Sequence, residues 1–381
     1  MKISDIADII NVTEKDPSNC GIDVFVGLEH YDIAEPVIKR FGSTKMLTTA
    51  TKKFEAGDVL IARRNVYLQR ASVARFSGLT SGDSIILRVK KNLCSENTDY
   101  DTMCQLLPFI LNSINFWDYA NTNADGTMSK RLSPAMLLEY EFDLPSLAEQ
   151  KVLAEKLWAA YEVKQSYLRM IEATQEMVKS QFIEMFKDTK RERLGDFCTT
   201  HARIGWQKLT RAEFLDMGDF YLITGWDIMD DHTVDFSKCK YVSKERYEQD
   251  PKLIMREDDV LLTKDGTLGK VAIVRGLDKP ATLNGHIFVI RSKDGRIIPE
   301  FLIGLFTSNE FICQLNDNKV GSTIAGITQK SLLEFQIPVA TIEEQLDFVS
   351  IMKQADKSEF ELRKSIDAID KVIKSLINEN L

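Results

Sequence analysis

The sequence of 381 residues is poor in the side chains that build metal centres and disulfide frameworks. Its six cysteines are scattered without a C-x-x-C pair, and none of its four histidines lie four residues apart. This pattern argues against a zinc site and a disulfide framework, and it favours a reducing, cytoplasmic location. There is also no run of eighteen apolar residues and no signal-peptide pattern at the start, so we expect no membrane partner.

Motifs that carry catalysis are missing as well. We find no N-P-P-[FY] or D-P-P-[FY] run of an amino-methyltransferase, no G-x-G-x-x-G and no nucleophile elbow. Gly266–Val271 resembles the end of a P-loop, but the upstream glycine is missing and Val271 replaces Ser or Thr. The acidic run Glu257–Asp259 precedes an expected strand and is interpreted as a turn. We therefore predict a chain that is not an enzyme and binds no cofactor itself.

The distribution of charge matters more than its total. A formal net charge of −8 argues at first against a nucleic-acid partner. Basic and acidic residues nearly balance in 1–140 and 191–334, however, and half or more of the deficit lies in the two remaining segments. A locally basic face on either balanced segment is therefore compatible with the composition.

What the sequence does contain is two long segments that predict helices. The first begins with Pro145 and Ser146 ahead of Glu149, a capping-box pattern. About forty residues without Gly or Pro follow, enough for a helix roughly 60 Å long. Alternate steps of four and three residues give an apolar seam with polar breaks, which indicates a helix that needs a partner. The seam consists of Leu153, Leu157, Ala160, Lys164, Tyr167, Ile171, Thr174, Val178, Gln181 and Met185.

The second segment is predicted to be that partner. Ile337–Gln345 repeats the start Leu144–Gln150 with two extra residues, giving again a proline, then Glu-Gln, then a long helix. The alternative is that the two helices are unrelated surface helices. The seam of the second helix consists of Phe348, Met352, Ala355, Glu359, Leu362, Ile366, Ile369, Ile373 and Leu376.

The segments around these helices repeat with a period of about 195 residues. Phe54–Ile61 parallels Met255–Leu262, and Val24–Glu29 parallels Tyr221–Trp226. The order is therefore globular half, long helix, globular half, long helix. The predicted domains are 1–143, 144–190, 191–336 and 337–381.

Each globular half is predicted to be a mixed α/β domain. We assign Trp226 to the core rather than to a binding surface. Strands are expected at Val59–Ala62, Ser84–Val89, Val260–Thr263 and His286–Arg291, and short helices at Met103–Asn112 and Pro299–Thr307.

The two helix starts, the segments G-D-V-L-I-A-R-R-N and D-D-V-L-L-T-K-D-G, and the Gly126-Thr127 and Gly321-Ser322 turns resemble one family in their order and duplication. It is the specificity subunit of type I restriction-modification systems, and the resemblance covers essentially the whole chain. It implies two target-recognition domains on double-stranded DNA with a bipartite target, held apart by an antiparallel coiled-coil spacer. Residues 195–225 match the first half only loosely, which leaves the bases read by the second half open.

The resemblance also implies partners. Two methyltransferase subunits would bind the long helices and carry S-adenosylmethionine, and restriction subunits using ATP and Mg would join through them. Two other functions remain open: a stand-alone tandem DNA-binding regulator, and a coiled-coil scaffold whose globular halves bind no DNA. Tight specific binding without partners would indicate the regulator, and strong salt dependence of DNA binding by the complex would exclude the scaffold.

Candidate DNA contacts in the first half lie between Asp58 and Asp83, where no acidic residue occurs. Arg can bind guanine, Asn and Gln can bind adenine, and Arg and Lys also hold phosphates. A loop whose arginines pair with carboxylates elsewhere in the protein is the alternative. The candidates are Arg63, Arg64, Asn65, Tyr67, Gln69 and Arg70, together with Lys130 and Arg131 as possible phosphate contacts.

In the second half, the loop that corresponds to the arginine loop is Thr263–Lys270, and its glycines allow a phosphate to approach the backbone. Gly321-Ser322-Thr323 and Lys330 form the counterpart of the Gly126 turn. For His286, a structural role at the start of a strand is the alternative. The candidates are Lys264, Thr267, Lys270, His286, Ser322, Thr323 and Lys330.

Overall fold

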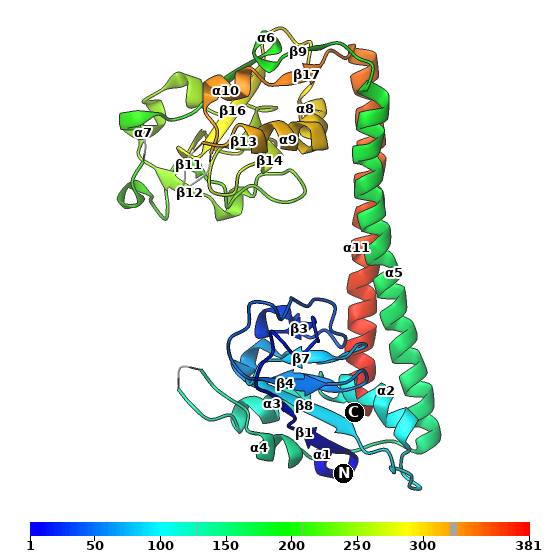
Figure 1. Cartoon of the computed structure of the whole chain (residues 1–381). Helices are drawn as coiled ribbons and strands as arrows, with labels where there is room; N and C mark the ends of the chain where they lie inside the picture. Colours follow the sequence, from blue (N-terminus) through cyan, green and yellow to red (C-terminus); the bar gives the residue numbers. More distant parts are fainter. Residues whose placement is uncertain (128, 208, 321–325) are drawn as a thin grey trace. The chain divides into compact units, whose positions relative to one another are not determined.

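The computed structural model describes residues 1–127, 129–207, 209–320 and 326–381. The chain divides into two compact units (Figure 1). Unit 1 comprises Met1–Leu168 and Arg363–Leu381, and unit 2 comprises Arg169–Leu362. Both long helices, α5 (Leu147–Phe186) and α11 (Ile342–Asn380), therefore contribute to each unit. No described helix is both long and apolar enough to cross a lipid bilayer.

Unit 1 is built on an antiparallel sheet with the strand order β1-β8-β5-β6. Residues of β5 alternate between two apolar clusters: Val59 and Ile61 face one, and Leu60 and Ala62 face the other. Because both faces are covered, the central strands are almost continuously apolar. The strands are β1 (Ala7–Ile10), β5 (Val59–Ala62), β6 (Ala71–Val73) and β8 (Ser84–Val89).

A second sheet in unit 1 has the order β2-β4-β7-β3, with β3 and β7 parallel. The turn η1 follows β3 directly, and η2 lies between β5 and β6. The elements are β2 (Thr13–Glu14), β3 (Phe25–Val26), η1 (Leu28–His30), β4 (Thr51–Phe54), η2 (Val66–Leu68) and β7 (Gly78–Thr80).

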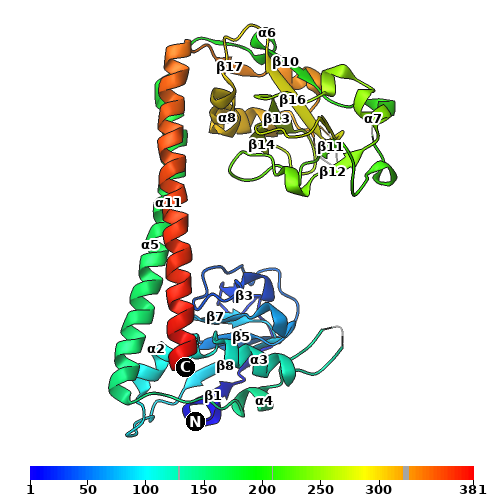
Figure 2. The same ribbon diagram turned by 180° about the vertical axis from the view of Figure 1, so that it is seen from behind.

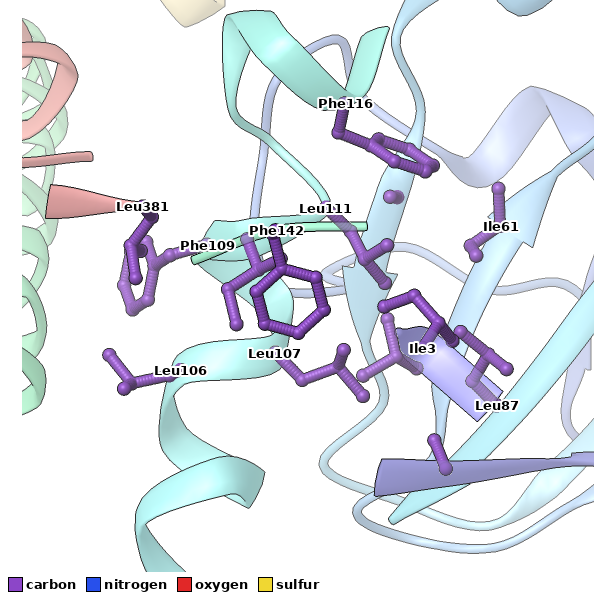
Figure 3. Close-up of a cluster of buried hydrophobic side chains, with 14 of the residues drawn as sticks. Ile3, Ile61, Leu87, Leu106, Leu107, Phe109, Leu111, Phe116, Phe142 and Leu381 are labelled. Atoms are coloured by element: carbon purple, nitrogen blue, oxygen red, sulfur yellow. The ribbon is translucent and has the colours of Figure 1, made fainter. Parts of the chain in front are cut away.

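Helices cover the larger cluster of unit 1. The Asp99 side chain caps α2 by accepting from the Thr102 N–H at 2.8 Å. Leu107 points toward Ile3 and Leu87 near the sheet, while Leu381 at the end of α11 lies against Phe109 (Figure 3). The C-terminal residue is therefore part of this core. The helices are α1 (Ile3–Ile6), α2 (Tyr100–Ile110), α3 (Ile114–Thr122) and α4 (Pro134–Leu138).

Unit 2 repeats this plan. Its antiparallel sheet has the order β10-β16-β13-β14, and in its second sheet, β12-β11-β15, β11 and β15 are parallel as β3 and β7 are. Helix α8 packs over β13 and β14 (Figure 2). The strands are β10 (Cys198–His201), β11 (Phe220–Ile223), β12 (Lys240–Val242), β13 (Val260–Thr263), β14 (Val271–Ile273), β15 (Ala281–Leu283) and β16 (Ile287–Ser292).

The other elements of unit 2 are short, and most are capped by Ser, Thr or Asp side chains. The helices are α6 (Leu194–Phe197), α7 (Lys244–Glu248), α8 (Pro299–Thr307), α9 (Asn309–Asp317) and α10 (Gln329–Leu333). The 3-10 turns are η3 (Gly205–Gln207), η4 (Arg211–Glu213), η5 (Phe236–Lys238) and η6 (Pro251–Leu253).

The predicted seams match the covered faces of the long helices, because every seam position is buried or half-buried. Within each unit, α5 and α11 run antiparallel. Two of the polar breaks, Lys164 and Glu359, have partners on the facing helix: Lys164 forms a 2.6 Å ion pair with Asp370 in unit 1, and Glu359 accepts from Gln175 at 3.0 Å in unit 2. Polar breaks of this kind fix the register of two helices.

The second long helix starts five residues later than its predicted segment. Gln336–Pro338 forms strand β17, which pairs with β9 (Arg191–Arg193), so helix α11 begins only at Ile342. In the repeated helix start, Ser146 therefore corresponds to Thr341. The two extra residues, Val339 and Ala340, lie between Pro338 and Thr341.

The repeated Glu-Gln pair has two separate tasks at each helix start. Glu149 accepts from the backbone N–H and the hydroxyl of Ser146 at 2.9 and 2.7 Å, and Glu344 does the same at Thr341 at 2.8 and 2.9 Å. These hydrogen bonds lower the pKa of both carboxyl groups. They complete the capping box that the sequence predicts.

The glutamine of each pair turns inward. Gln150 donates to the carbonyl oxygens of Asn97 and Pro145 at 2.6 and 2.8 Å. Gln345 donates to those of Arg296 and Ala340 at 2.7 and 3.0 Å. Both glutamines are fully buried, so each fastens a long helix to the loop beside it.

A buried ion pair also recurs in both units. Arg88 on β8 reaches Asp58 at 2.6 and 2.8 Å, and Arg291 on β16 reaches Asp259 at 2.6 Å through both nitrogens. The aspartates are 1% and 3% exposed, and each also accepts from a backbone N–H of its own turn. This pairing explains why an aspartate precedes the repeated Val-Leu segment, since it ties the turn to the central strands.

Candidate nucleic-acid interface

In unit 1, two predicted segments far apart in the sequence meet. The Asn65 N–H donates to the Lys130 carbonyl at 2.9 Å, and the Leu132 N–H donates to the Arg63 carbonyl at 3.0 Å. The Ser129 hydroxyl donates to the Asn65 amide oxygen at 2.9 Å. The loop after β5 and the hairpin around Gly126 therefore form one surface.

This surface is basic and partly open to solvent. Arg63 and Arg64 approach the carboxylate of Asp83 only at 3.4 and 3.7 Å, and their side chains remain 30% and 44% exposed. Ion pairs of this length and exposure contribute little, so both guanidinium groups can turn to a phosphate or a base. Lys130 and Arg131 are exposed on the hairpin beside them.

Lys52 is a contributor to this surface that the sequence did not reveal. Its ammonium donates to the Ser84 carbonyl at 2.9 Å. The Arg63 N–H donates to the carbonyl of the preceding residue, Asp83, at 3.1 Å, so Lys52 and Arg63 lie close together. Burial and the neighbouring Arg63 lower the pKa of Lys52. Lys52 lies on β4, outside the acid-free segment, and only the pairing of β4 in the second sheet brings it here. We define the unit 1 basic surface as Lys52, Arg63, Arg64, Lys130 and Arg131.

The other predicted residues of the loop have different surroundings. Tyr67 is 63% exposed, whereas Asn65 and Gln69 hold left-handed turns with φ of 57° and 50°. Arg70 points inward and donates to the carbonyl oxygens of Leu28 and Arg64 at 2.8 and 3.0 Å, and burial lowers its pKa. Within this geometry Arg70 joins two turns of the protein.

Unit 2 brings the corresponding segments together. The Ile327 N–H donates to the Lys264 carbonyl, and the Lys264 N–H donates to the His286 carbonyl, both at 2.9 Å. A Cβ atom on Gly326 would lie 2.8 Å from the Lys264 carbonyl oxygen, so only glycine allows this approach. The His286 imidazole contacts the carboxylate of Asp265. The candidates Lys264 and His286 therefore lie together. Asp265, an acidic residue that was not among the candidates, lies beside both.

The remaining candidates of unit 2 are spread more widely. Lys270 donates to the Ile228 carbonyl at 3.3 Å, which is the counterpart of the contact made by Arg70. Thr267 is exposed at the tip of the loop, and Lys330 is exposed on α10. Candidates Ser322 and Thr323 lie outside the described residues.

The assignment of Trp226 to the core is wrong, because its side chain is 86% exposed. In the turn after β11 it is Asp227 that points inward, where it is 3% exposed and burial raises its pKa. Asp227 accepts from the backbone N–H and hydroxyl of Thr224 at 2.7 and 2.9 Å. Capping the turn thus fixes the neighbouring Trp226 on the outside.

Comparison with known proteins gives consistent matches. The family model described as "Type I restriction modification DNA specificity domain" matches residues 187–370. The Type I restriction enzyme MjaVIII specificity subunit of Methanocaldococcus jannaschii is 22% identical over 283 residues, which is 68% of this chain and 65% of that protein. The Type I restriction enzyme EcoBI specificity subunit of Escherichia coli is 25% identical over 299 residues, 68% of this chain and 61% of that protein. This chain thus spans less than two thirds of each relative.

The fold has a counterpart among solved structures. A chain from the structure "Structural basis underlying complex assembly and conformational transition of the type I R-M system" superposes with a TM-score of 0.61 at 14% identity. The match covers 100% of this chain and 97% of that chain. The two therefore share an arrangement of two globular halves and two long helices.

Proposed function

We propose that this chain is a specificity subunit of a type I restriction-modification system and that it reads a bipartite sequence in double-stranded DNA, a proposal supported by its matches to the specificity domain and to two specificity subunits. Each target-recognition domain, 1–143 and 191–336, reads one half-site. The observation that carries the proposal is that three corresponding segments meet in both units. They are the loop after β5 or β13, the residue before β8 or β16 (Asp83 or His286), and the segment at Leu132 or Ile327. Together they bring cationic and hydrogen-bonding side chains to one surface. DNA recognition needs such a local set, whatever the total charge of the chain.

The unit 1 basic surface supplies both kinds of contact that recognition requires. Arg63 and Arg64 can bind guanine edges or phosphates, while Lys130 and Arg131 on the adjoining hairpin can hold the backbone. In unit 2, Lys264, Thr267, His286 and Lys330 fill the corresponding role. Lys270, like Arg70, supports the loop by bonding to a neighbouring carbonyl oxygen. Ser322 and Thr323 complete the proposed set.

Catalysis belongs to the partners in this proposal. Two methyltransferase subunits, each with S-adenosylmethionine, dock on the long helices and methylate an adenine in each half-site. Such enzymes reach their target by turning the base out of the helix. Restriction subunits that use ATP and Mg join through them in the cytoplasm. This chain decides only which sequence the complex recognises.

The segments 144–190 and 337–381 act as the spacer. Since both helices run through both units, their length sets the unread gap between the half-sites. An insertion of about four residues adds about one helical turn. Matched insertions into α5 and α11 should therefore change the gap and leave the bases of both half-sites unchanged.

Methylation mapping tests the proposal directly. The chain is co-expressed with the neighbouring methyltransferase gene, and methylated adenines are located by single-molecule sequencing. We expect one bipartite motif with a fixed gap, and we expect it to disappear when this chain is deleted. Methylation that the deletion leaves unchanged would contradict the proposal and favour the regulator or the scaffold.

A further inference from the structure

The turn after β11 presents a large apolar side chain on a fixed backbone. Trp226 is 86% exposed, although indole is among the largest apolar groups available for burial. The backbone around it is held by the cap from Asp227 to Thr224 and by the Trp226 N–H, which donates to the Thr224 hydroxyl at 3.3 Å. The exposure of Trp226 is therefore set by an ordered turn.

This turn lies against the proposed DNA-reading segments of unit 2. A Cβ atom on Gly225 would lie 3.4 Å from the Thr267 hydroxyl, which puts the residue next to Trp226 in contact with the tip of the loop. The Asn284 N–H donates to the Ile223 carbonyl at 2.9 Å, so the segment leading to His286 adjoins the same turn. The indole therefore stands at the edge of the proposed DNA surface.

The fold itself does not need a tryptophan at this position. In unit 1 the corresponding turn is closed by His30, whose Nδ1 accepts from the Gly27 N–H at 2.9 Å, as Asp227 accepts from Thr224. The residue at the place of Trp226 is Glu29, whose side chain is 69% exposed. Because a carboxylate serves the same turn, packing does not account for the indole in unit 2.

We propose that Trp226 contacts a nucleobase of the half-site read by unit 2, as a specificity-determining residue that adds an apolar contact to the polar ones. This inference rests on the proposed function. The contact is with the C5 methyl group of a thymine in the major groove, or with the face of a base at a step that the inserted indole unstacks. Since no phosphate is neutralised, the contact strengthens binding without changing its salt dependence.

The test uses the full chain assembled with its methyltransferase subunits and a duplex carrying the mapped bipartite sequence. Trp226→Ala should weaken binding to this duplex about tenfold or more, as measured by fluorescence anisotropy. Trp226→Phe should retain most of the affinity. Binding to an unrelated duplex and the slope of log K against log salt should stay unchanged. Met217→Ala, at the other end of β11 and 84% exposed in the wild type, serves as the matched control.

Modified bases separate the two forms of the contact. If a thymine methyl is bound, replacing that thymine by deoxyuridine should weaken the wild-type complex but not Trp226→Ala. If a base face is bound, DNA binding should quench an indole fluorescence component that Trp226→Phe lacks, and no deoxyuridine should matter.

Several outcomes would overturn the inference while leaving the proposed function intact. These are a Trp226→Ala complex that binds the bipartite duplex as wild type does, an equal loss on unrelated DNA, or a loss confined to assembly with the methyltransferase. A wild-type complex that binds no bipartite duplex would instead refute the proposed function itself.

Discussion

The two units share a scaffold but differ in the chemistry of their tips. In each unit, a buried aspartate just before a central strand binds an arginine on the neighbouring strand of the sheet: Asp58 before β5 binds Arg88 on β8, and Asp259 before β13 binds Arg291 on β16. At the other end of those strands the acidic and basic side chains exchange places. Asp83 faces Arg64 in unit 1, whereas His286, at the position of Asp83, faces Asp265, at the position of Arg64.

This difference separates residues that specify the fold from residues free to specify the ligand. The aspartate of each buried pair is enclosed, so losing its arginine leaves a carboxylate that water does not solvate and that no cation neutralises. The pair at the tip is partly exposed, so solvent tolerates either polarity. Under the proposed function, a duplicated domain can therefore keep one scaffold and read two different half-sites.

The largest effect is expected from breaking the buried pair. Arg291→Met leaves the carboxylate of Asp259 buried and unpaired, and should lower the free energy of unfolding of unit 2 by about 3–5 kcal/mol. Arg88→Met should cost unit 1 less, because the Arg88 side chain is 27% exposed against 16% for Arg291. Hydrogen exchange with mass spectrometry resolves the two units. Removing both charges with Asp259→Asn should restore part of the loss; an unperturbed Arg291→Met variant would refute the argument.

The glutamines at the helix starts should show a smaller difference. Gln345→Ala removes three hydrogen bonds, since its amide oxygen also accepts from the Ile298 N–H at 3.0 Å, whereas Gln150→Ala removes two. Each should cost about 1–3 kcal/mol, with Gln345 the costlier. Denaturant unfolding measures the difference. Gln354→Ala, exposed on the same helix, is the control, and an equal loss there would rule out the buried contacts as the cause.

The exchange of acidic and basic side chains at the tips should make the two units respond differently in DNA binding. Arg64→Ala should weaken binding through the first half-site by about 1–3 kcal/mol if it reads a base, or reduce the salt slope by about one if it holds a phosphate. Asp265→Asn should alter affinity for the second half-site without reducing the slope, because no cation is lost. Duplexes mutated in one half-site at a time identify the unit affected. An equal reduction of the salt slope by both substitutions would show that the two tips do not differ in the charge that they present to DNA.

The smallest effect concerns the capping glutamates, where the units should behave alike. Their pKa values lie below the ordinary 4.5 in the folded chain, so their stabilisation is present above that pH and is lost as the pH falls through the folded-state values. Glu149→Gln and Glu344→Gln should each flatten the loss of thermal stability between about pH 5 and about pH 3. Unequal flattening would show that the two helix starts are not equivalent.

Periodic features were predictable from the sequence. The seams of α5 and α11, the capping box of α5 and strands such as Val59–Ala62 follow from local patterns of apolar, capping and helix-forming residues. The duplication added the pairing of the long helices, because the same start occurs twice. The acid-free arginine loop was also visible, since charge can be counted along the chain.

Long-range pairing decided the rest. Lys52 joins the basic surface only because β4 pairs with β7, Gln336–Pro338 becomes a strand because β9 lies beside it, and Asp58 finds its arginine 30 residues away. Trp226 shows the same limit: apolar character predicted burial, but the cap formed by Asp227 set which side of the turn faces solvent. Local sequence determines which elements form, whereas the contacts between elements determine which side chains those elements leave exposed.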